Sequence, residues 1–214
     1  MPFKNRKEAG LLLAKKLRAY QNSNPLVLGI PRGAVPMASI ISEKLKGELD
    51  VVLVHKIGAP GNPEFAIGSV AEDGTVYLNE ITAKMPGVEK FVREQAPIEA
   101  EKLRNRRKQY APYRKPADPK DRVVIIVDNG MATGATMIAA LRLIRMKKPS
   151  RLIAAAAVSP LETVNRISRE ADETIILKVP KDFFAVGQFF GDFTQVTDEE
   201  VAACFPERAA PTRK

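Results

Sequence analysis

The chain of 214 residues contains one cysteine, one histidine and no tryptophan. A single cysteine, Cys204, allows no disulfide within the chain, which agrees with a reducing, cytoplasmic location. Zinc sites built from several histidines and cysteines are excluded as well, so a bound metal would be a hard cation held by oxygen atoms. No apolar run approaches the roughly 20 residues of a membrane span, and the charged N-terminal segment lacks the pattern of a signal peptide. We therefore expect a cytoplasmic protein.

Positive charge is in excess, with 34 lysines and arginines against 25 aspartates and glutamates and a formal net charge of +9. Such a balance attracts polyanions, which include nucleic acid, acidic membrane surfaces and phosphorylated substrates. Much of the excess lies in the run KLRNRRKQYAPYRK, from Lys102 to Lys115. This run is either a solvated helix face, the usual role of such charge, or a contact surface for nucleic acid.

Apolar segments with strand and helix periodicity alternate along the chain. The expected strands cover residues 26–30, 51–55, 123–127, 152–158 and 174–177. The expected helices cover residues 6–20 (capped by Asn5), 35–46, 88–109, 135–146 and 161–169. The alternation after residue 123 predicts an α/β fold, a Rossmann-like parallel sheet with helices on both faces. Polar or glycine-bearing turns follow three strands, and ligands bind at the carboxyl ends of strands in such sheets.

Residues 56–72 contain many breakers of regular structure, with four glycines or prolines between Gly58 and Pro63. Long connections inside compact domains are often functional, so we expect a flexible loop over residues 57–72. Short strands over residues 65–70 and 75–78 are expected to form a hairpin through Asp73-Gly74.

The most informative segment reads VVIIVDNGMATGAT, from Val123 to Thr136. It combines a buried strand, the polar pair Asp128-Asn129, a loop of small residues and the start of a helix. Backbone N–H groups of such a loop and the positive end of the helix together form an anion site. The polar pair upstream suits hydroxyl groups or a metal ion. The segment therefore predicts a site for a sugar phosphate.

This segment resembles the signature of type I phosphoribosyltransferases that binds 5-phosphoribosyl 1-pyrophosphate (PRPP). The stretches IPRGAVPMA, VHKIGAPGNPEFAIGSVAE and DFFAVGQFFGDFTQVTDEEV are similar to predicted phosphoribosyltransferases of unassigned substrate, and the resemblance extends from Phe3 to about Phe205. It implies one phosphoribosyltransferase domain over residues 1–214, with a core over about 22–178. It also implies a small hood subdomain, built from the N-terminal helix and residues 180–205.

The resemblance implies the following roles for individual residues. The 5-phosphate of PRPP would be held by the loop and helix start, at Ala132, Thr133, Gly134, Ala135 and Thr136. Asp128 and Asn129 would face the ribose hydroxyls and form the catalytic pair. Pyrophosphate would be bound by Arg32, Gly33 and Lys56, and the turn at Arg32 often contains a strained or cis peptide bond in this family. Phe184 and Val186 would contact the acceptor base, with Phe184 stacked on it.

The implied reaction attacks C1 of PRPP with a ring nitrogen of a small-molecule base and releases pyrophosphate through a transition state that resembles an oxocarbenium ion. Mg²⁺ is the implied cofactor and would lie near Asp128 through the substrate, and a homodimer is the usual assembly in the superfamily. Such chemistry belongs to the glycosyltransferases of nucleotide metabolism. It needs no nucleophilic side chain, which suits a chain with so little histidine and cysteine.

One residue departs from the signature, because Asn129 stands where the family usually has a second carboxylate. Asparagine can still hydrogen-bond a ribose hydroxyl, but it supplies no negative charge. A weakened enzyme, a PRPP-responsive regulator that binds nucleic acid, and a family that tolerates asparagine all fit this change. Motifs of P-loop NTPases, Rossmann dinucleotide-binding proteins and serine hydrolases are absent, so the regulator is the alternative that remains.

Overall fold

The computed structural model describes residues 1–78, 82, 84–110 and 115–205. Within these residues the helices are α1 (Arg6–Lys16), α2 (Val35–Leu45), α4 (Val88–Tyr110), α5 (Ala135–Met146), α6 (Leu161–Ile167) and α7 (Asp198–Ala203), with short 3-10 helices η1 (Arg18–Tyr20) and η2 (Val186–Phe189). The strands are β1 (Leu26–Gly29), β2 (Glu48–Val51), β3 (Val54–Ala59), β4 (Asn62–Ala71), β5 (Val76–Leu78), β6 (Val123–Gly130), β7 (Arg151–Val158) and β8 (Glu173–Lys178).

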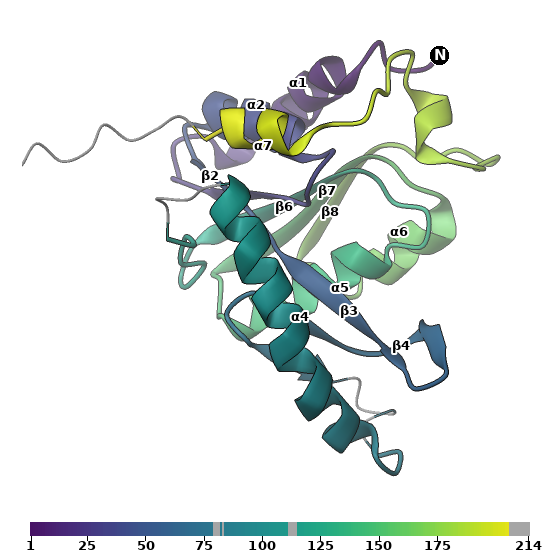
Figure 1. The fold of residues 1–214 in the computed structure, drawn as a ribbon. Coiled ribbons are helices and arrows are strands. Elements are labelled where there is room, and N and C mark those ends of the chain that lie inside the picture. Colours follow the sequence, from purple (N-terminus) through teal and green to yellow (C-terminus); the bar gives the residue numbers. More distant parts are fainter. Residues whose placement is uncertain (79–81, 83, 111–114, 206–214) are drawn as a thin grey trace, which may run out of the picture.

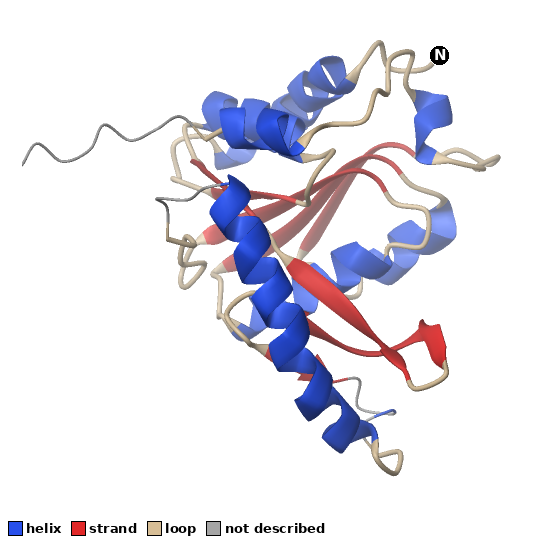
Figure 2. Cartoon of the chain, in the orientation of Figure 1, coloured by secondary structure: helices blue, strands red, loops and turns tan. Residues whose placement is uncertain are grey.

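The central sheet of the described residues has the strand order β2-β1-β6-β7-β8, and all of its neighbouring strands are parallel. Helices α1 and α2 cover one face of this sheet, and α5 and α6 cover the other (Figures 1 and 2). The predicted α/β fold with helices on both faces is therefore confirmed. No helix of the described residues is long and apolar enough to cross a membrane.

Alternation along the buried strands assigns successive side chains to the two faces of the sheet. In β6, Ile125 and Val127 pack with α1 and α2, whereas Val124 and Ile126 pack with α5 and α6. These side chains are all fully buried. A shift of register by one residue would therefore not expose them to solvent, but would move each of them to the opposite face of the sheet. The same alternation sends the next two side chains, Asp128 and Asn129, toward opposite faces.

A second, antiparallel sheet of β3, β4 and β5 corrects two expectations. The predicted strand 51–55 is divided, because β2 ends at Val51 and a new strand in the other sheet begins at Val54. The segment expected as a flexible loop over residues 57–72 is mostly the hairpin of β3 and β4. Its turn uses Gly61 with a φ of 74°, and irregular register at Gly58 accommodates the breakers. The predicted pairing of the next two strands through Asp73-Gly74 is confirmed.

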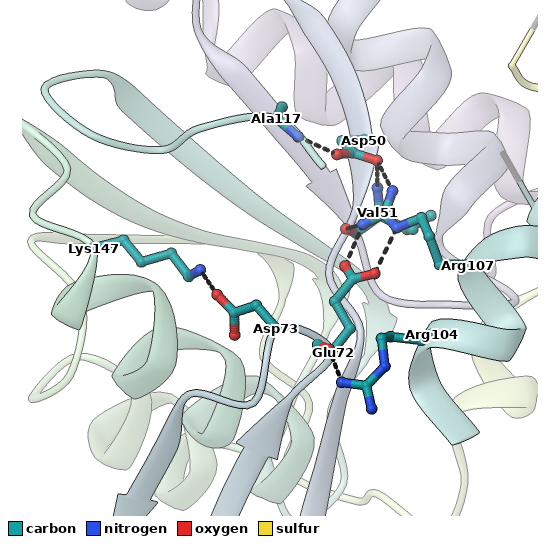
Figure 3. A network of polar contacts seen from close by, with 8 residues as sticks. All are labelled: Asp50, Val51, Glu72, Asp73, Arg104, Arg107, Ala117 and Lys147. Atoms are coloured by element: carbon teal, nitrogen blue, oxygen red, sulfur yellow. Dashed lines mark hydrogen bonds and ion pairs between the residues drawn. The ribbon is translucent and has the colours of Figure 1, made fainter. Parts of the chain in front are cut away.

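Helix α4 packs along this second sheet, to which it contributes Val88, Val92 and Leu103. Near its end, the buried Arg107 joins the carboxylates of Asp50 and Glu72 (Figure 3). Arg107 Nη2 also donates to the Val51 carbonyl at 3.1 Å. These contacts fix the helix and the end of β4 to the edge of the central sheet.

The N-terminal segment and the segment after β8 lie together above the carboxyl ends of the core strands. Phe3 and Phe190 form a β-bridge, and their rings are 5.4 Å apart. The Asn5 side chain accepts a hydrogen bond from the Glu8 N–H, so the expected N-cap is confirmed, but the helix ends at Lys16 and continues as the short η1. The two segments, residues 3–16 and 180–205, are called the hood.

Candidate functional site

The turn after β1 and the end of β6 lie side by side at the carboxyl edge of the sheet. Gly29 pairs with Val127, and the Ile30 N–H donates to the Val127 carbonyl at 3.0 Å. The chain therefore leaves β1 through Arg32-Gly33 next to the point where β6 reaches Asp128-Asn129. The strand order reverses between these strands, which makes this edge the topological switch point, where open α/β sheets bind ligands.

The loop between β6 and α5 has two of its carbonyl groups bound by side chains of α6. Thr163 Oγ1 donates to the Ala132 carbonyl at 2.6 Å, and Arg166 Nη2 donates to the Thr133 carbonyl at 2.7 Å. The residues Ala132, Thr133 and Thr136 are exposed, and Ala135 is half-buried. The first-turn N–H groups of α5 have no partners within the helix, so the loop presents an anion site.

Gly134 is required by this geometry for two reasons. Its φ is 69°, a left-handed conformation at the N-cap of α5 that other residues adopt at a cost. A Cβ on this residue would also lie 2.8 Å from Thr163 Cγ2 and 3.1 Å from Ile167 Cδ1. The glycine thus lets α6 pack directly beneath the loop.

Asp128 lies on the α5 side of β6, at the base of the loop. Burial raises the pKa of this carboxyl group from its ordinary value of 3.8 to about 6, although hydrogen bonds from the backbone N–H groups of Asn129 and Gly130 favour the charged form. The bond from Asn129 N to Asp128 Oδ1 is 2.7 Å long. The carboxylate is therefore ionised at pH 7 but only weakly solvated, and a nearby cationic centre would stabilise it.

This pKa predicts a specific dependence of stability on pH. Between pH 4 and pH 6 the native Asp128 keeps a proton that the unfolded chain has released, so the free energy of unfolding falls as pH rises through this window. Above pH 6 the cost is complete and amounts to roughly 1–3 kcal/mol. Urea titrations at several pH values should show this fall in the wild type relative to Asp128→Asn. Parallel pH profiles of the two proteins would contradict the prediction.

Asn129 points to the other face, toward the hood. Its side chain is 8% exposed, and Oδ1 has no hydrogen-bond partner among the described residues. A Cβ at Gly33 would collide with Nδ2 of Asn129, so the glycine allows the amide to lie directly against the turn after β1. Asn129 is thus in contact with the Arg32-Gly33 turn, whereas Asp128 lies on the opposite face of the sheet.

The turn itself contains a cis peptide bond between Pro31 and Arg32, as the resemblance implies. Arg32 Nη1 lies 3.8 Å from Asp198 Oδ2 at the start of α7, and both side chains are about two-fifths exposed. Asp198 also accepts a hydrogen bond of 2.9 Å from the Tyr110 hydroxyl. Burial and this bond raise the pKa of Tyr110 to about 12. Arg32 is thus held by a carboxylate that an incoming anion would have to replace.

Lys56 was expected at the end of a core strand and lies instead within β3, opposite Ser69. It shares a strand face with Val54, which packs against the core cluster that includes α5. His55, on the other face, lies 3.6 Å from Glu99 of α4. Lys56 therefore faces α5. It belongs to the second sheet, whereas the turn at Arg32 follows β1 of the central sheet.

The hood carries the residues expected to contact a base. Phe184 is 89% exposed, and its backbone N–H and that of Ala185 both donate at 3.0 Å to Gln188 Oε1, which fixes the loop. A Cβ at Gly130 would lie only 2.7 Å from Val186 Cγ1. Val186 thus packs on the end of β6, directly after the polar pair, and Phe184 presents an open aromatic face.

Several residues at this edge were not found from the sequence. Thr163 and Arg166 of α6 hold the loop, Asp198 holds Arg32, and Arg6 of α1 reaches the turn from the hood. Each acts across a long separation in sequence and belongs to no motif. The sequence indicates that a helix begins after Asn5, but it does not indicate which distant loop the side chain of Arg6 contacts.

The chain matches the family model described as "Phosphoribosyl transferase domain" over residues 4–190. It is 36% identical over 210 residues to "Putative phosphoribosyl transferase MT0597" of Mycobacterium tuberculosis, a match that covers 97% of this chain and 47% of the relative. The chain therefore spans about half the length of this curated relative. The crystal structure of TT1426 from Thermus thermophilus is similar with a TM-score of 0.89 and 43% identity, over 95% of this chain and 97% of that one.

Proposed function

Because the chain belongs to the phosphoribosyl transferase family, we propose that it binds PRPP with Mg²⁺ and transfers the phosphoribosyl group to a nitrogenous base, with release of pyrophosphate. The observation that carries the proposal is the pairing of an anion loop, Ala132 to Thr136, with Asp128 at the switch point of the sheet. The loop would bind the phosphate, and the carboxylate would stabilise the positive charge that develops on the sugar ring. The two groups must therefore be separated by about the length of a ribose. The hood above it would receive the acceptor.

The 5-phosphate would bind the loop through the backbone N–H groups at the start of α5 and the hydroxyls of Thr133 and Thr136. The ties from α6 support this role, because they fix two carbonyl groups of the loop and leave its N–H groups for the ligand. The pyrophosphate would bind at the turn after β1, where Arg32 supplies charge and Gly33 allows close approach. Lys56, from the hairpin, would supply a second cation to the pyrophosphate.

Asp128 would act electrostatically in the transfer step. As the bond from C1 to pyrophosphate breaks, positive charge develops on the sugar ring, and a carboxylate held in a weakly solvated site stabilises it more than water does. Its oxygens are also suitable for Mg²⁺, which binds one or two carboxylates together with substrate phosphates and retains several waters. Bound Mg²⁺ would neutralise the leaving pyrophosphate. Asn129 would hydrogen-bond a ribose hydroxyl.

The acceptor is proposed to be a flat, nitrogen-containing base. The exposed ring of Phe184 offers a stacking surface, and Val186 would limit the depth of the pocket against the end of β6. Closure of the hood over such a base would exclude water from the sugar cation, which water would otherwise trap.

The binding half of the proposal is tested by calorimetric titration with PRPP in the presence of Mg²⁺. We expect saturable one-site binding, and we expect Gly134→Val to abolish it because the valine Cβ would collide with Thr163. Thr163→Ser, which keeps the hydroxyl that ties the loop, serves as the matched control and should bind nearly as the wild type does. Absence of PRPP binding to the wild type would overturn the proposal.

Release of Arg32 from Asp198 makes a separate prediction. Asp198→Asn should bind pyrophosphate about twofold to fivefold more tightly than the wild type, because a half-exposed ion pair worth up to about 1 kcal/mol no longer competes for Arg32. Inorganic pyrophosphate with Mg²⁺ is the ligand to titrate. Asp118→Asn, at an exposed carboxylate before β6, is the control and should leave the affinity unchanged. Equal affinities of Asp198→Asn and the wild type would show that Arg32 is not a pyrophosphate ligand.

A further inference from the structure

Tyr110, the last residue of α4, brings a buried hydroxyl group to the start of α7. The residue is 2% exposed, and its side chain belongs to the core that α4 shares with the hairpin, to which the hood contributes Val196 and Val201. The hydroxyl donates a hydrogen bond of 2.9 Å to Asp198 Oδ1. Because the ring is held on all sides by this core, the hydroxyl is a fixed point against which the carboxylate of Asp198 is held.

The carboxylate of Asp198 has a different neighbour at each of its oxygen atoms. Oδ1 accepts the bond from Tyr110, and Oδ2 lies 3.8 Å from Nη1 of Arg32. Hydrogen bonds between a guanidinium and a carboxylate are usually about 2.7–2.9 Å long, so the ion pair between Asp198 and Arg32 is open. Both of these side chains are about two-fifths exposed, whereas Tyr110 is buried. The contact that fixes the carboxylate is therefore the one with Tyr110.

The hydroxyl also limits the geometry that the ion pair can adopt. A guanidinium binds a carboxylate most strongly through two parallel hydrogen bonds, which use both carboxylate oxygens. The Tyr110 hydroxyl already occupies Oδ1 of Asp198. Burial, with the bond to Asp198 and the charge of that carboxylate, raises the pKa of Tyr110 to about 12, so the hydroxyl keeps its proton at neutral pH and remains a donor.

We propose that Tyr110 is a positioning residue of the pyrophosphate site, which holds Asp198 so that the ion pair with Arg32 stays open and Arg32 remains available to an incoming anion. The inference rests on the proposed function, in which Arg32 binds pyrophosphate, and adds that the end of α4 controls how tightly Arg32 is held in the empty site. Without the hydroxyl, both oxygens of Asp198 are free to turn to Arg32. Pyrophosphate would then have to break a closed ion pair.

The variant Tyr110→Phe separates this role from a purely structural one. Phenylalanine retains the ring, which fills the core between α4 and the hairpin, and removes only the hydroxyl that reaches Asp198. The side chain of Asp198 is 45% exposed, so water can replace the lost hydrogen bond. We therefore expect the variant to fold, and a change in its ligand binding reports on the contact with Asp198.

The test is a calorimetric titration with inorganic pyrophosphate and Mg²⁺. We expect Tyr110→Phe to bind pyrophosphate about twofold to fivefold more weakly than the wild type, the range that one half-exposed ion pair accounts for. In the Asp198→Asn background no carboxylate competes for Arg32, so addition of Tyr110→Phe should leave the affinity unchanged. Ribose 5-phosphate, which lacks the pyrophosphate group, should bind Tyr110→Phe as tightly as the wild type.

Tyr20→Phe is the matched control, because the Tyr20 hydroxyl donates to the carboxylate of Glu173, at the opposite edge of the sheet, where β8 begins. It removes the same kind of bond and should bind pyrophosphate as the wild type does. Unchanged or tighter binding by Tyr110→Phe would overturn the inference. Equal weakening in the Asp198→Asn background, or toward ribose 5-phosphate, would overturn it as well, because either result indicates a structural role. If the wild type does not bind pyrophosphate, the proposed function fails first, so the two failures are distinguishable.

Discussion

Asp128→Asn is expected to lower the rate of phosphoribosyl transfer by about a hundredfold or more, the effect of removing one electrostatic contact to a transition state. The substitution preserves the shape of the side chain and its ability to accept from the backbone N–H of Asn129. It removes only the negative charge that we propose stabilises the sugar cation. The loss should therefore appear mainly in kcat, with affinity for ribose 5-phosphate close to that of the wild type.

The stability of the same variant shows whether a slower rate arises from unfolding. Above pH 6 the charged, poorly solvated carboxylate of Asp128 lowers the free energy of unfolding. The neutral asparagine should therefore make the protein more stable at pH 7, not less. A slower and more stable variant cannot owe its slowness to unfolding, and this combination is typical of functional residues held against stability. Asp118→Asn, the same substitution at an exposed carboxylate before β6, should leave the rate unchanged. A rate for Asp128→Asn within threefold of the wild type would exclude the electrostatic role.

Arg107→Leu is expected to cost about 3–5 kcal/mol of the free energy of unfolding, the range measured when one partner of a buried ion pair is removed. Arg107 is 7% exposed and Asp50 is 1% exposed, so the leucine would leave the buried Asp50 and the largely buried Glu72 without their cation (Figure 3). The backbone N–H of Ala117, which donates to Asp50 Oδ2 at 2.8 Å, would compensate only in part. Urea denaturation measures the change.

Arg106→Leu is the matched control for this variant. It lies one position earlier on α4 and is exposed, so its effect should stay within about 0.5 kcal/mol. The network lies beneath the hairpin that carries Lys56, so Arg107→Leu should also weaken PRPP binding through disorder of the hairpin. A cost below 1 kcal/mol would mean that the carboxylates find solvent or other partners when the arginine is removed.

The basic run that the sequence offered as a nucleic-acid surface is partly engaged within the protein. Lys102 lies 2.7 Å from Glu99, Arg104 lies 2.7 Å from Glu101, and Arg107 is buried. Residues 111–114 of the run lie outside the described residues. The described part of the run thus resembles the ordinary charged face of a helix, with cations and carboxylates paired three residues apart.

The core sheet was predictable because its strands are buried on both faces and are separated by amphipathic helices. Continuous β-branched runs such as 123–127 are typical of strands buried on both faces, and α5 begins and ends where its periodicity indicates. The hairpin of β3 and β4 was missed for a physical reason. Its glycines and prolines normally end strands, but here they occupy a two-residue turn and an irregular register, which only the pairing of distant residues reveals.

Some residues of the candidate site were likewise predictable from the sequence, and others were not. Asp128, the loop to Thr136 and the turn at Arg32-Gly33 are contiguous motifs, so the sequence indicated them and the parallel sheet brings their strands together. Arg6 and Asp198 reach the same edge from opposite ends of the chain and carry no motif of their own. Their participation depends on the packing of the hood, which local sequence does not encode.

Release of pyrophosphate shows whether this site transfers a phosphoribosyl group. The protein is incubated with PRPP, Mg²⁺ and a panel of purine, pyrimidine and other nitrogenous bases. We predict pyrophosphate release with at least one base, dependent on Mg²⁺ and about a hundredfold slower in Asp128→Asn. Tight PRPP binding without turnover across the whole panel would contradict the account, and would instead favour a PRPP-responsive regulator.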